Sequence, residues 1–142
     1  MYDNIRINKA FKDIKNIDKR FIILYGGAGS GKSHYMSQHV ILNCLNKYNV
    51  KWCVVRKVAR TIKESVFAEL TARIREYNLS DFFTINKTDF SIICDVTGSK
   101  IIFIGIDDPE KIKSISNITK FWIEEASELT AEDFRQLNLR LR

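Results

Sequence analysis

The segment at residues 26–33, which reads Gly-Gly-Ala-Gly-Ser-Gly-Lys-Ser, constrains the fold of this chain more than any other feature. It fits the pattern G-x-x-x-x-G-K-[ST] and lies between an apolar run at residues 21–25 and a helical pattern that begins near Gly31. A glycine-rich turn between a strand and a helix can point successive backbone N–H groups inward, and the helix N-terminus adds a partial positive charge. We therefore predict a phosphate-binding loop, with residues 21–25 as the strand that leads into it.

The predicted ligands of this loop are ATP and Mg²⁺. Lys32 is expected to reach the β- and γ-phosphates, and the Ser33 hydroxyl is expected to take one position on Mg²⁺. A glycine-rich turn that binds nothing is the alternative, but the full match to the pattern in this setting favours phosphate binding. The predicted nucleotide-binding residues are Gly26, Gly27, Ala28, Gly29, Ser30, Gly31, Lys32 and Ser33.

Length and composition indicate one globular domain, which we assign to residues 1–142. Hydrophobic residues make up 45% of the chain and charged residues 28%, which argues against a disordered chain. No apolar run approaches the ~20 residues that cross a bilayer, so we expect no membrane segment. Cys44, Cys53 and Cys94 are odd in number and lack C-x-x-C spacing. This favours reduced thiols, in the core or on the surface, in a cytoplasmic protein.

The net charge of +6 is unevenly distributed along the chain. Residues 51–75 carry seven basic side chains against two acidic ones. Such an excess fits a polyanionic partner such as nucleic acid, although a solvated basic face without a partner would look the same.

Apolar runs and helical stripes alternate along the chain, which predicts an α/β fold. Besides residues 21–25, the predicted strands are residues 51–55, 91–96, 100–105 and 120–123, with a hairpin turn at residues 97–99. One predicted helix follows the loop, a second covers residues 62–77, and two more begin at Asp108 and Thr130. We expect a three-layer P-loop NTPase fold with a mainly parallel sheet, in which ligands bind at the carboxyl ends of the strands.

Two acidic residues follow the last predicted strand. A carboxylate in that place, beside the loop, can hold Mg²⁺, and we assign this role to Glu124. The next carboxylate can orient and deprotonate an attacking water, and we assign this role to Glu125. A solvated acidic cluster at a helix entry is the alternative, and the loop upstream favours the catalytic interpretation.

A further cation is expected, because charge accumulates on the phosphoryl oxygens in the transition state. Arg56 is the first candidate, since it ends a predicted strand whose carboxyl end should face the nucleotide, and Arg60 is the second. Either arginine could instead contact a DNA phosphate or pair with a surface acid. The adenine is expected near Lys19 and Arg20, just before the first predicted strand.

With these segments placed, the chain resembles the ATPase domain of phage terminase large subunits, and most closely the branch of phages and defective prophages of Gram-positive hosts. The resemblance runs from about residue 20 to residue 142. The P-loop itself is common to many families, whereas its combination with the later segments is specific. The matching features are Tyr-Gly-Gly-Ala-Gly-Ser-Gly-Lys-Ser (25–33), Val-Val-Arg-Lys-Val (54–58), Ser65 after a basic helix start, Ile-Phe-Ile-Gly-Ile-Asp-Asp (102–108), Lys-Ile-Lys-Ser-Ile (111–115) and Trp-Ile-Glu-Glu-Ala-Ser-Glu-Leu (122–129).

The resemblance implies ATP hydrolysis coupled to the translocation of double-stranded DNA into a procapsid, in the host cytoplasm. It also implies a homo-oligomeric ring docked on a portal protein, a small terminase subunit as partner, and a separate nuclease domain outside these residues. A helicase-like repair ATPase and a nucleotide- or DNA-binding module without turnover are the alternatives.

Four departures from the family pattern bear on these expectations. Many relatives have Arg where this chain has Ala28, and the nearest basic residues before the acidic pair are Lys111 and Lys113, which fit a trans-acting role less well than Arg. The acidic pair is Glu-Glu instead of Asp-Glu. In the family, a strand that follows the acidic pair inserts between the P-loop strand and the Glu124 strand, and this chain ends before any such strand. We therefore expect a sheet that is incomplete at the C-terminus, in the N-terminal part of a larger two-domain protein.

Overall fold

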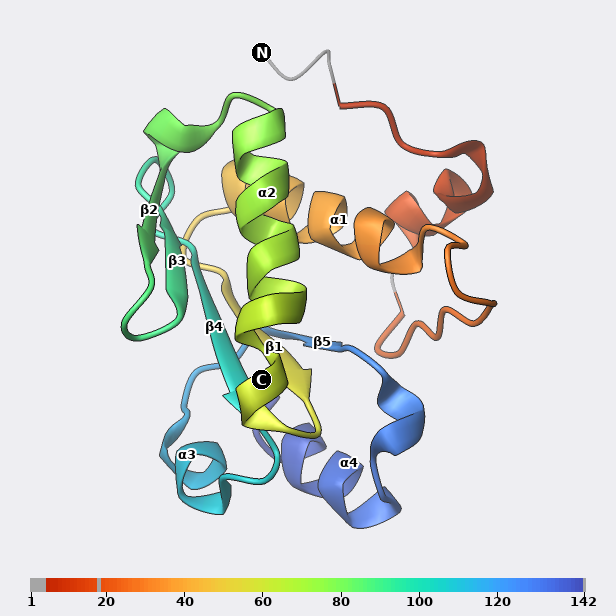
Figure 1. The fold of residues 1–142 in the computed structure, drawn as a ribbon, viewed down its shortest axis with the longest axis vertical. Helices are drawn as coiled ribbons and strands as arrows, with labels where there is room; N and C mark the ends of the chain where they lie inside the picture. The colour runs from red at the N-terminus through yellow and green to blue at the C-terminus, as the bar shows by residue number, and fades with distance from the viewer. Residues whose placement is uncertain (1–4, 18, 142) are drawn as a thin grey trace.

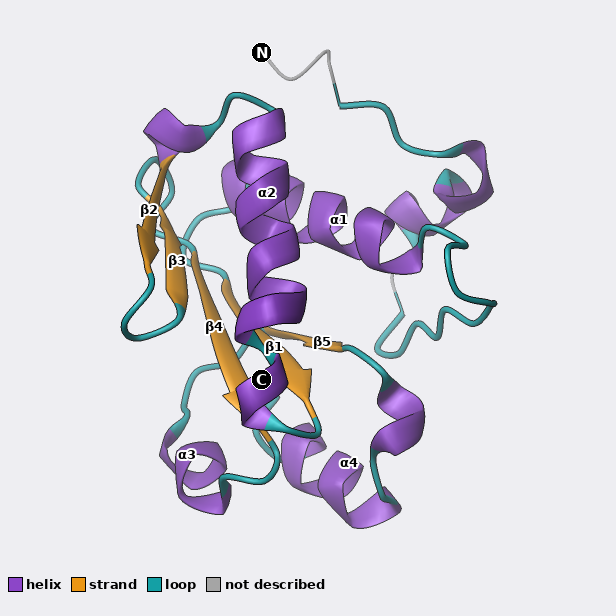
Figure 2. Ribbon diagram, viewed as in Figure 1, coloured by secondary structure: helices purple, strands orange, loops and turns teal. Residues whose placement is uncertain are grey.

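Helices and strands alternate along the chain in the computed structural model, which describes residues 5–17 and 19–141 (Figure 1 and Figure 2). The strands are β1 (Lys51–Arg56), β2 (Phe83–Asn86), β3 (Ser91–Cys94), β4 (Lys100–Gly105) and β5 (Lys120–Ile123). The α-helices are α1 (Lys32–Asn46), α2 (Ala68–Glu76), α3 (Pro109–Ser114) and α4 (Ala131–Asn138). A π-helical turn, Lys63–Phe67, leads into α2, and 3₁₀ turns lie at Lys9–Phe11, Asp13–Asn16, Ala59–Thr61, Ser80–Phe82 and Ala126–Glu128.

The strands form one sheet in the order β2-β3-β4-β1-β5. The three strands β4, β1 and β5 run parallel, and Val54 of β1 pairs with Phe103 on one side and Trp122 on the other. β2, β3 and β4 run antiparallel, which confirms the predicted hairpin at residues 97–99. The carboxyl ends of the parallel strands therefore meet at one edge, as ligand binding in an α/β fold requires.

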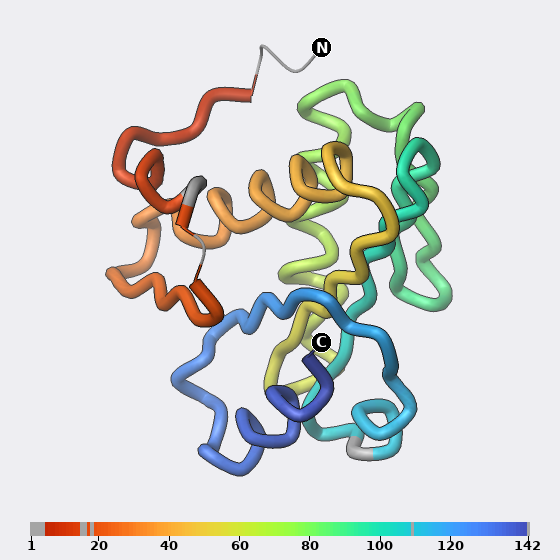
Figure 3. Tube along the Cα trace, turned by 180° about the vertical axis from the view of Figure 1, so that it is seen from behind, coloured from red at the N-terminus to blue at the C-terminus, as the bar shows by residue number. Residues whose placement is uncertain are grey.

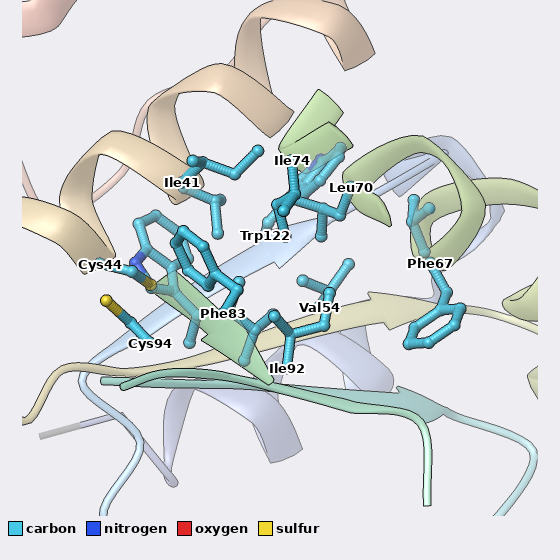
Figure 4. Close-up of a cluster of buried hydrophobic side chains, with 14 of the residues drawn as sticks. Ile41, Cys44, Val54, Phe67, Leu70, Ile74, Phe83, Ile92, Cys94 and Trp122 are labelled. Carbon is cyan, nitrogen blue, oxygen red and sulfur yellow. The ribbon is translucent and has the colours of Figure 1, made fainter. Parts of the chain in front are cut away.

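One hydrophobic cluster fills the space between the sheet and the helices α1 and α2. Trp52 and Val54 project from β1 toward Ile41 of α1 and Leu70 of α2, and all four side chains are buried. Figure 4 shows how the apolar stripes of both helices converge on the strands. The second predicted helix accordingly packs its apolar stripe on the core, although its first turns are 3₁₀ and π-helical.

A second cluster covers the other face of the sheet. Cys53 and Val55 alternate with the residues of the first cluster, as the two-residue repeat of a strand dictates, and they pack with Ile112 of α3 and Leu137 of α4. The sheet is therefore sandwiched between helix pairs, and the expected three-layer α/β fold is confirmed. No helix among the described residues is long and apolar enough to span a membrane.

The apolar run at residues 21–25 is not a strand, and the prediction made for it is wrong. The segment is irregular, and Phe21, Ile22, Ile23 and Tyr25 are exposed, with Ile23 at 84% and Tyr25 at 93%. Figure 3 shows this part of the chain running along the outside of the molecule. A strand requires backbone hydrogen bonds to a neighbour. Among the described residues, no strand pairs with residues 21–25 or with the free side of β5.

Candidate functional site

Two glycines with left-handed backbone shape the end of the loop at residues 26–33. Gly29 and Gly31 have φ angles of 73° and 83°, a region that other residues enter only at a cost. Gly31 is the N-cap of α1, and its carbonyl accepts from the Tyr35 N–H at 2.9 Å. Helix α1 therefore begins at Lys32, with its free N–H groups at the end of the loop.

The Lys32 side chain folds back along the loop. Its ammonium donates to the carbonyl oxygens of Gly26 at 2.6 Å and Gly27 at 3.0 Å, and to Ser30 Oγ at 2.9 Å. The positive charge is thus held at the loop and surrounded by oxygen acceptors. A phosphate bound by the loop would meet this ammonium directly.

Ser33 and Glu124, which are 91 residues apart in sequence, are in direct contact. Ser33 Oγ donates to Glu124 Oε1 at 2.6 Å, and Trp122 Nε1 donates to Glu124 Oε2 at 3.1 Å. Ser33 lies in the first turn of α1, and Glu124 directly follows β5. Both carboxylate oxygens of Glu124 are therefore fixed beside the helix that follows the loop.

Glu125 differs from Glu124 in both exposure and backbone. Its side chain is exposed, and no described residue hydrogen-bonds to its carboxylate. Its φ of 54° is left-handed, and this turn redirects the chain from β5 into the 3₁₀ turn at Ala126–Glu128. The structure thus brings Glu124, but not Glu125, into contact with Ser33.

Arg56 is the last residue of β1 and lies beside Glu124. The Glu124 N–H donates to the Val55 carbonyl at 2.9 Å, which continues the β1–β5 pairing past the end of β5. Arg56 also continues the series of β1 residues that face α1 and α2, whereas Lys57 points to α4. The Arg56 Nε atom is buried and has no hydrogen-bond partner among the described residues.

The other basic residues considered from sequence lie elsewhere or have partners. Lys113 pairs with Glu110 at 3.1 Å on the surface of α3. The Arg20 guanidinium donates to Asn138 Oδ1 of α4 at 3.0 Å, so it points away from the loop. Arg60 is exposed in the turn that follows β1.

A cavity of about 360 Å³ beside the loop was not anticipated from sequence. Its lining is mostly apolar, and part of it comes from the N-terminal 3₁₀ turns, which carry no motif. The spacing of Phe11 and Ile14 among polar residues was the only available signal, and it is a weak one. The lining residues are Ala10, Phe11, Ile14, Ile23, Leu24, Tyr25, Ser30 and Lys32.

The oxygen donors at the site fit Mg²⁺. Mg²⁺ prefers hard oxygen ligands and is usually held by one or two protein groups together with water and phosphates. The Ser33 hydroxyl and the Glu124 carboxylate provide two such groups within hydrogen-bonding distance of each other. The described residues contain no cluster of three or more His, Cys, Asp or Glu side chains that could enclose a metal without such a co-ligand.

An ion pair ties the helix after the acidic residues to the end of β1. Lys57 Nζ lies 2.6 Å from Asp133 Oδ2 of α4, and Thr130 and Asp133 form the capping box that begins this helix. The hydrogen bond from Lys57, aided by the Thr130 N–H, lowers the pKa of Asp133. The segment that carries Glu124 and Glu125 is therefore held at both ends, by β5 and by α4.

The cysteines take no part in this site. Cys44, Cys53 and Cys94 are free and buried, which places them in the core. Burial raises the pKa of Cys44 and of Cys53 to about 12, so neither is a thiolate near neutral pH.

Comparison with known proteins places the chain in a family. A family model described as "Phage terminase large subunit" matches residues 18–142. The PBSX phage terminase large subunit of Bacillus subtilis (strain 168) is 35% identical over 137 residues, which are 96% of this chain and 31% of that protein. The terminase large subunit of Bacillus phage SPP1 is 30% identical over 129 residues, which are 88% of this chain and 30% of that protein. The chain thus spans about a third of the length of these relatives.

Solved structures with the same fold include the large terminase of a thermophilic bacteriophage. One crystal form gives a TM-score of 0.66 at 15% identity, covering 81% of this chain and 29% of that one. A form of that protein in complex with ADP gives a TM-score of 0.64 at 13% identity, covering 81% of this chain and 29% of that one. On the sequence matches, which extend over nearly the whole chain and agree with the resemblance found in its motifs, the protein belongs to the phage terminase large subunit family.

Proposed function

We propose that this chain is the ATPase part of a DNA-packaging motor, which hydrolyses ATP to move double-stranded DNA into a procapsid. The observation that carries the proposal is the 2.6 Å hydrogen bond from Ser33 Oγ to Glu124 Oε1. It joins the helix after the phosphate-binding loop to the acidic end of β5, and these are the two halves that the hydrolysis of a bound nucleotide requires.

In this proposal the loop at residues 26–33 holds the phosphates of ATP through its backbone N–H groups. Lys32, which is already held along the loop by three oxygen acceptors, transfers its hydrogen bonds to the β- and γ-phosphates. The mostly apolar cavity beside the loop suits the flat face of the base, and it replaces Lys19 and Arg20 as the proposed site for adenine.

Ser33 and Glu124 are the residues that would hold Mg²⁺. When bound, this ion neutralises charge on the phosphate oxygens. The Trp122 indole N–H fixes the second oxygen of the Glu124 carboxylate and so sets the orientation of that ligand.

Glu125 and Arg56 are proposed to act on the reacting group. The Glu125 carboxylate is exposed and has no hydrogen-bond partner among the described residues, so it is available to orient and deprotonate a water. Arg56 lies on the neighbouring strand end, where its guanidinium would stabilise charge on the transferred phosphoryl.

The proposed partners are those of a packaging motor at work in the bacterial cytoplasm. They are double-stranded DNA, a portal protein, a small terminase subunit and further copies of the same chain in a ring. The net charge of +6 supports the DNA contact, since Lys and Arg side chains supply the attraction to phosphates.

The test is steady-state phosphate release with and without double-stranded DNA, in a protein extended to the length of the relatives. We expect DNA to stimulate release. Lys32→Ala should lower it by roughly 10²–10³-fold through loss of a charge-stabilising donor, and Glu125→Ala by roughly 10²–10⁴-fold through loss of the general base. Glu128→Ala is the matched control, because it removes an exposed carboxylate from the same turn.

Nucleotide binding measured on the same proteins separates the alternatives. A motor should bind nucleotide normally after Glu125→Ala while losing turnover. A parent protein that binds nucleotide and never releases phosphate would overturn the motor and identify a binding module. A rate of ATP hydrolysis that DNA does not change would indicate an ATPase without the packaging role.

A further inference from the structure

A second cavity, of about 450 Å³, lies at the carboxyl end of β1. It is lined by Arg56, Arg60, Thr61, Glu64 and Ser65, and we call it the arginine cavity. None of the loop residues 26–33 lines it. The lining contains two arginines and one glutamate, so it carries a net positive charge, and the guanidinium groups provide its hydrogen-bond donors.

The Arg56 side chain has a hydrogen-bond donor without a partner among the described residues. Its Nε atom is buried, and no described residue accepts a hydrogen bond from it. Arg60 is likewise without an ion pair or hydrogen bond to a described residue. A buried donor left unpaired is unfavourable, and a charged one more so, which indicates that a ligand supplies the acceptor.

The helix beside the cavity departs from α-helical geometry at the same place. Lys63–Phe67 is a π-helical turn, and Glu64 and Ser65 reach the cavity from it. Ser65 Oγ donates to the Thr61 carbonyl at 2.5 Å and Thr61 Oγ1 to the Val58 carbonyl at 2.7 Å, so the two arginines are the donors left for a ligand. Single π-helical turns are rare and occur frequently at functional sites. The irregular turn is therefore a second, independent sign of a ligand here.

The loop that presents both arginines is fastened to the end of β4. Asp107 Oδ1 accepts from the Ala59 N–H at 2.9 Å, and Ile106 N donates to the Arg56 carbonyl at 3.0 Å. A Cβ on Gly105 would lie 2.4 Å from Ala59 N, so only glycine allows the loop to lie this close. Gly105 and Asp107 thus position the cavity wall from a neighbouring strand.

We propose that the arginine cavity is a phosphate-binding subsite, with Arg56 and Arg60 as its cations and Asp107 as a positioning residue. A pair of guanidinium groups matches the several oxygens of a phosphate group. The proposed function supplies two sources for that phosphate, the DNA backbone and the nucleotide tail, and to this extent the inference rests on it.

The experiment compares Arg60→Gln and Arg56→Gln with Arg75→Gln, which removes an exposed arginine in the last turn of α2. Binding of a fluorescent 30-base-pair DNA is followed by anisotropy at several salt concentrations. If the phosphate comes from DNA, each cavity variant binds roughly tenfold more weakly at low salt and its log–log salt slope falls by about one, because one phosphate contact is lost.

A second arm measures the affinity for a fluorescent ATP analogue. If the phosphate comes from the nucleotide tail, the cavity variants bind the ATP analogue roughly tenfold more weakly and have the same DNA affinity as Arg75→Gln. Cavity variants that match Arg75→Gln in both arms overturn the subsite. If the cavity variants lose DNA affinity and the parent protein hydrolyses no ATP, the subsite is supported and only the proposed function is refuted.

Asp107→Ala tests the positioning role by the sign of its effect. Removal of a surface carboxylate strengthens DNA binding when only overall charge matters. If Asp107 positions the loop, loss of its hydrogen bond to Ala59 releases the loop and weakens binding of the same ligand, DNA or the ATP analogue, that the arginine variants bind more weakly. The salt slope of DNA binding stays unchanged, because no cation is removed. A stronger complex would overturn the positioning role.

Discussion

β1 and residues 21–25 have similar apolar sequences and opposite surroundings. β1 pairs with β4 on one side and β5 on the other, and its residues Trp52–Val55 are buried. Residues 21–25 have no paired neighbour among the described residues and are mostly exposed. An apolar run therefore becomes a strand only where another strand offers its hydrogen bonds. The contact between Ser33 and Glu124 depends on α1 and β5, since it forms although residues 21–25 are not a strand.

The sharpest test of this comparison removes the same side chain from a buried and an exposed position. Ile74→Ala in α2 should lower the free energy of unfolding by about 2–5 kcal/mol, because Ile74 is fully buried and its loss leaves a cavity. Ile23→Ala should change it by less than about 0.5 kcal/mol, because Ile23 is 84% exposed. Urea unfolding measures both. Equal effects would show that residues 21–25 pack in solution.

A longer protein should abolish the difference between the two segments. The family resemblance implies a strand that inserts between β5 and residues 21–25, and this strand would give both segments a neighbour. The amides of residues 21–25 should then exchange with solvent roughly 100-fold more slowly in a protein of the relatives' length than in the 142-residue chain. The amides of β1 serve as the internal control. Equally fast exchange of residues 21–25 in both proteins would contradict the inserted strand.

The smallest expected effect concerns the attachment of α4 to β1. Because the pKa of Asp133 is lowered in the folded protein, its carboxylate stabilises the fold above the ordinary Asp pKa of about 3.9, and this contribution is lost as pH falls through the lower folded value. Asp133→Asn should therefore cost about 1 kcal/mol near pH 7, through the ion pair and the helix cap, and progressively less as pH falls through the lowered folded pKa.

The control for this prediction is Asp81→Asn, which makes the same change at an exposed carboxylate that has no ion pair or hydrogen bond among the described residues. Unfolding in urea across pH 2.5–7 checks both variants. A difference between wild type and Asp133→Asn that does not change with pH would show that the ion pair with Lys57 contributes nothing.

Much of the fold could be predicted from local pattern. The stripe of α1, the buried run of β1, the hairpin at residues 97–99 and the Thr130 cap all depend on residues close in sequence, and the structure confirms each of them. β2 was missed although Phe83–Asn86 alternates between apolar and polar residues, because a four-residue run is too short to stand out.

What the sequence could not reveal depends on contacts between distant residues. The exposure of residues 21–25 follows from the lack of a paired neighbour among the described residues, and the π-helical turn before α2 follows from packing that no local motif records. At the site, the loop pattern and the acidic pair indicated Ser33 and Glu124 separately. Trp122 could have been added, because a residue two positions before Glu124 on the same strand shares its face.

The left-handed backbone at Glu125 has a consequence for substitution at this position. Glycine would adopt that geometry without penalty, whereas for a residue with a Cβ it costs roughly 1 kcal/mol. Glycine at position 125 would remove the backbone strain of the turn and, at the same time, the carboxylate side chain. With Glu125 as the proposed general base, Glu125→Gly should raise folding stability and lower turnover, so the two properties would change in opposite directions at this single residue.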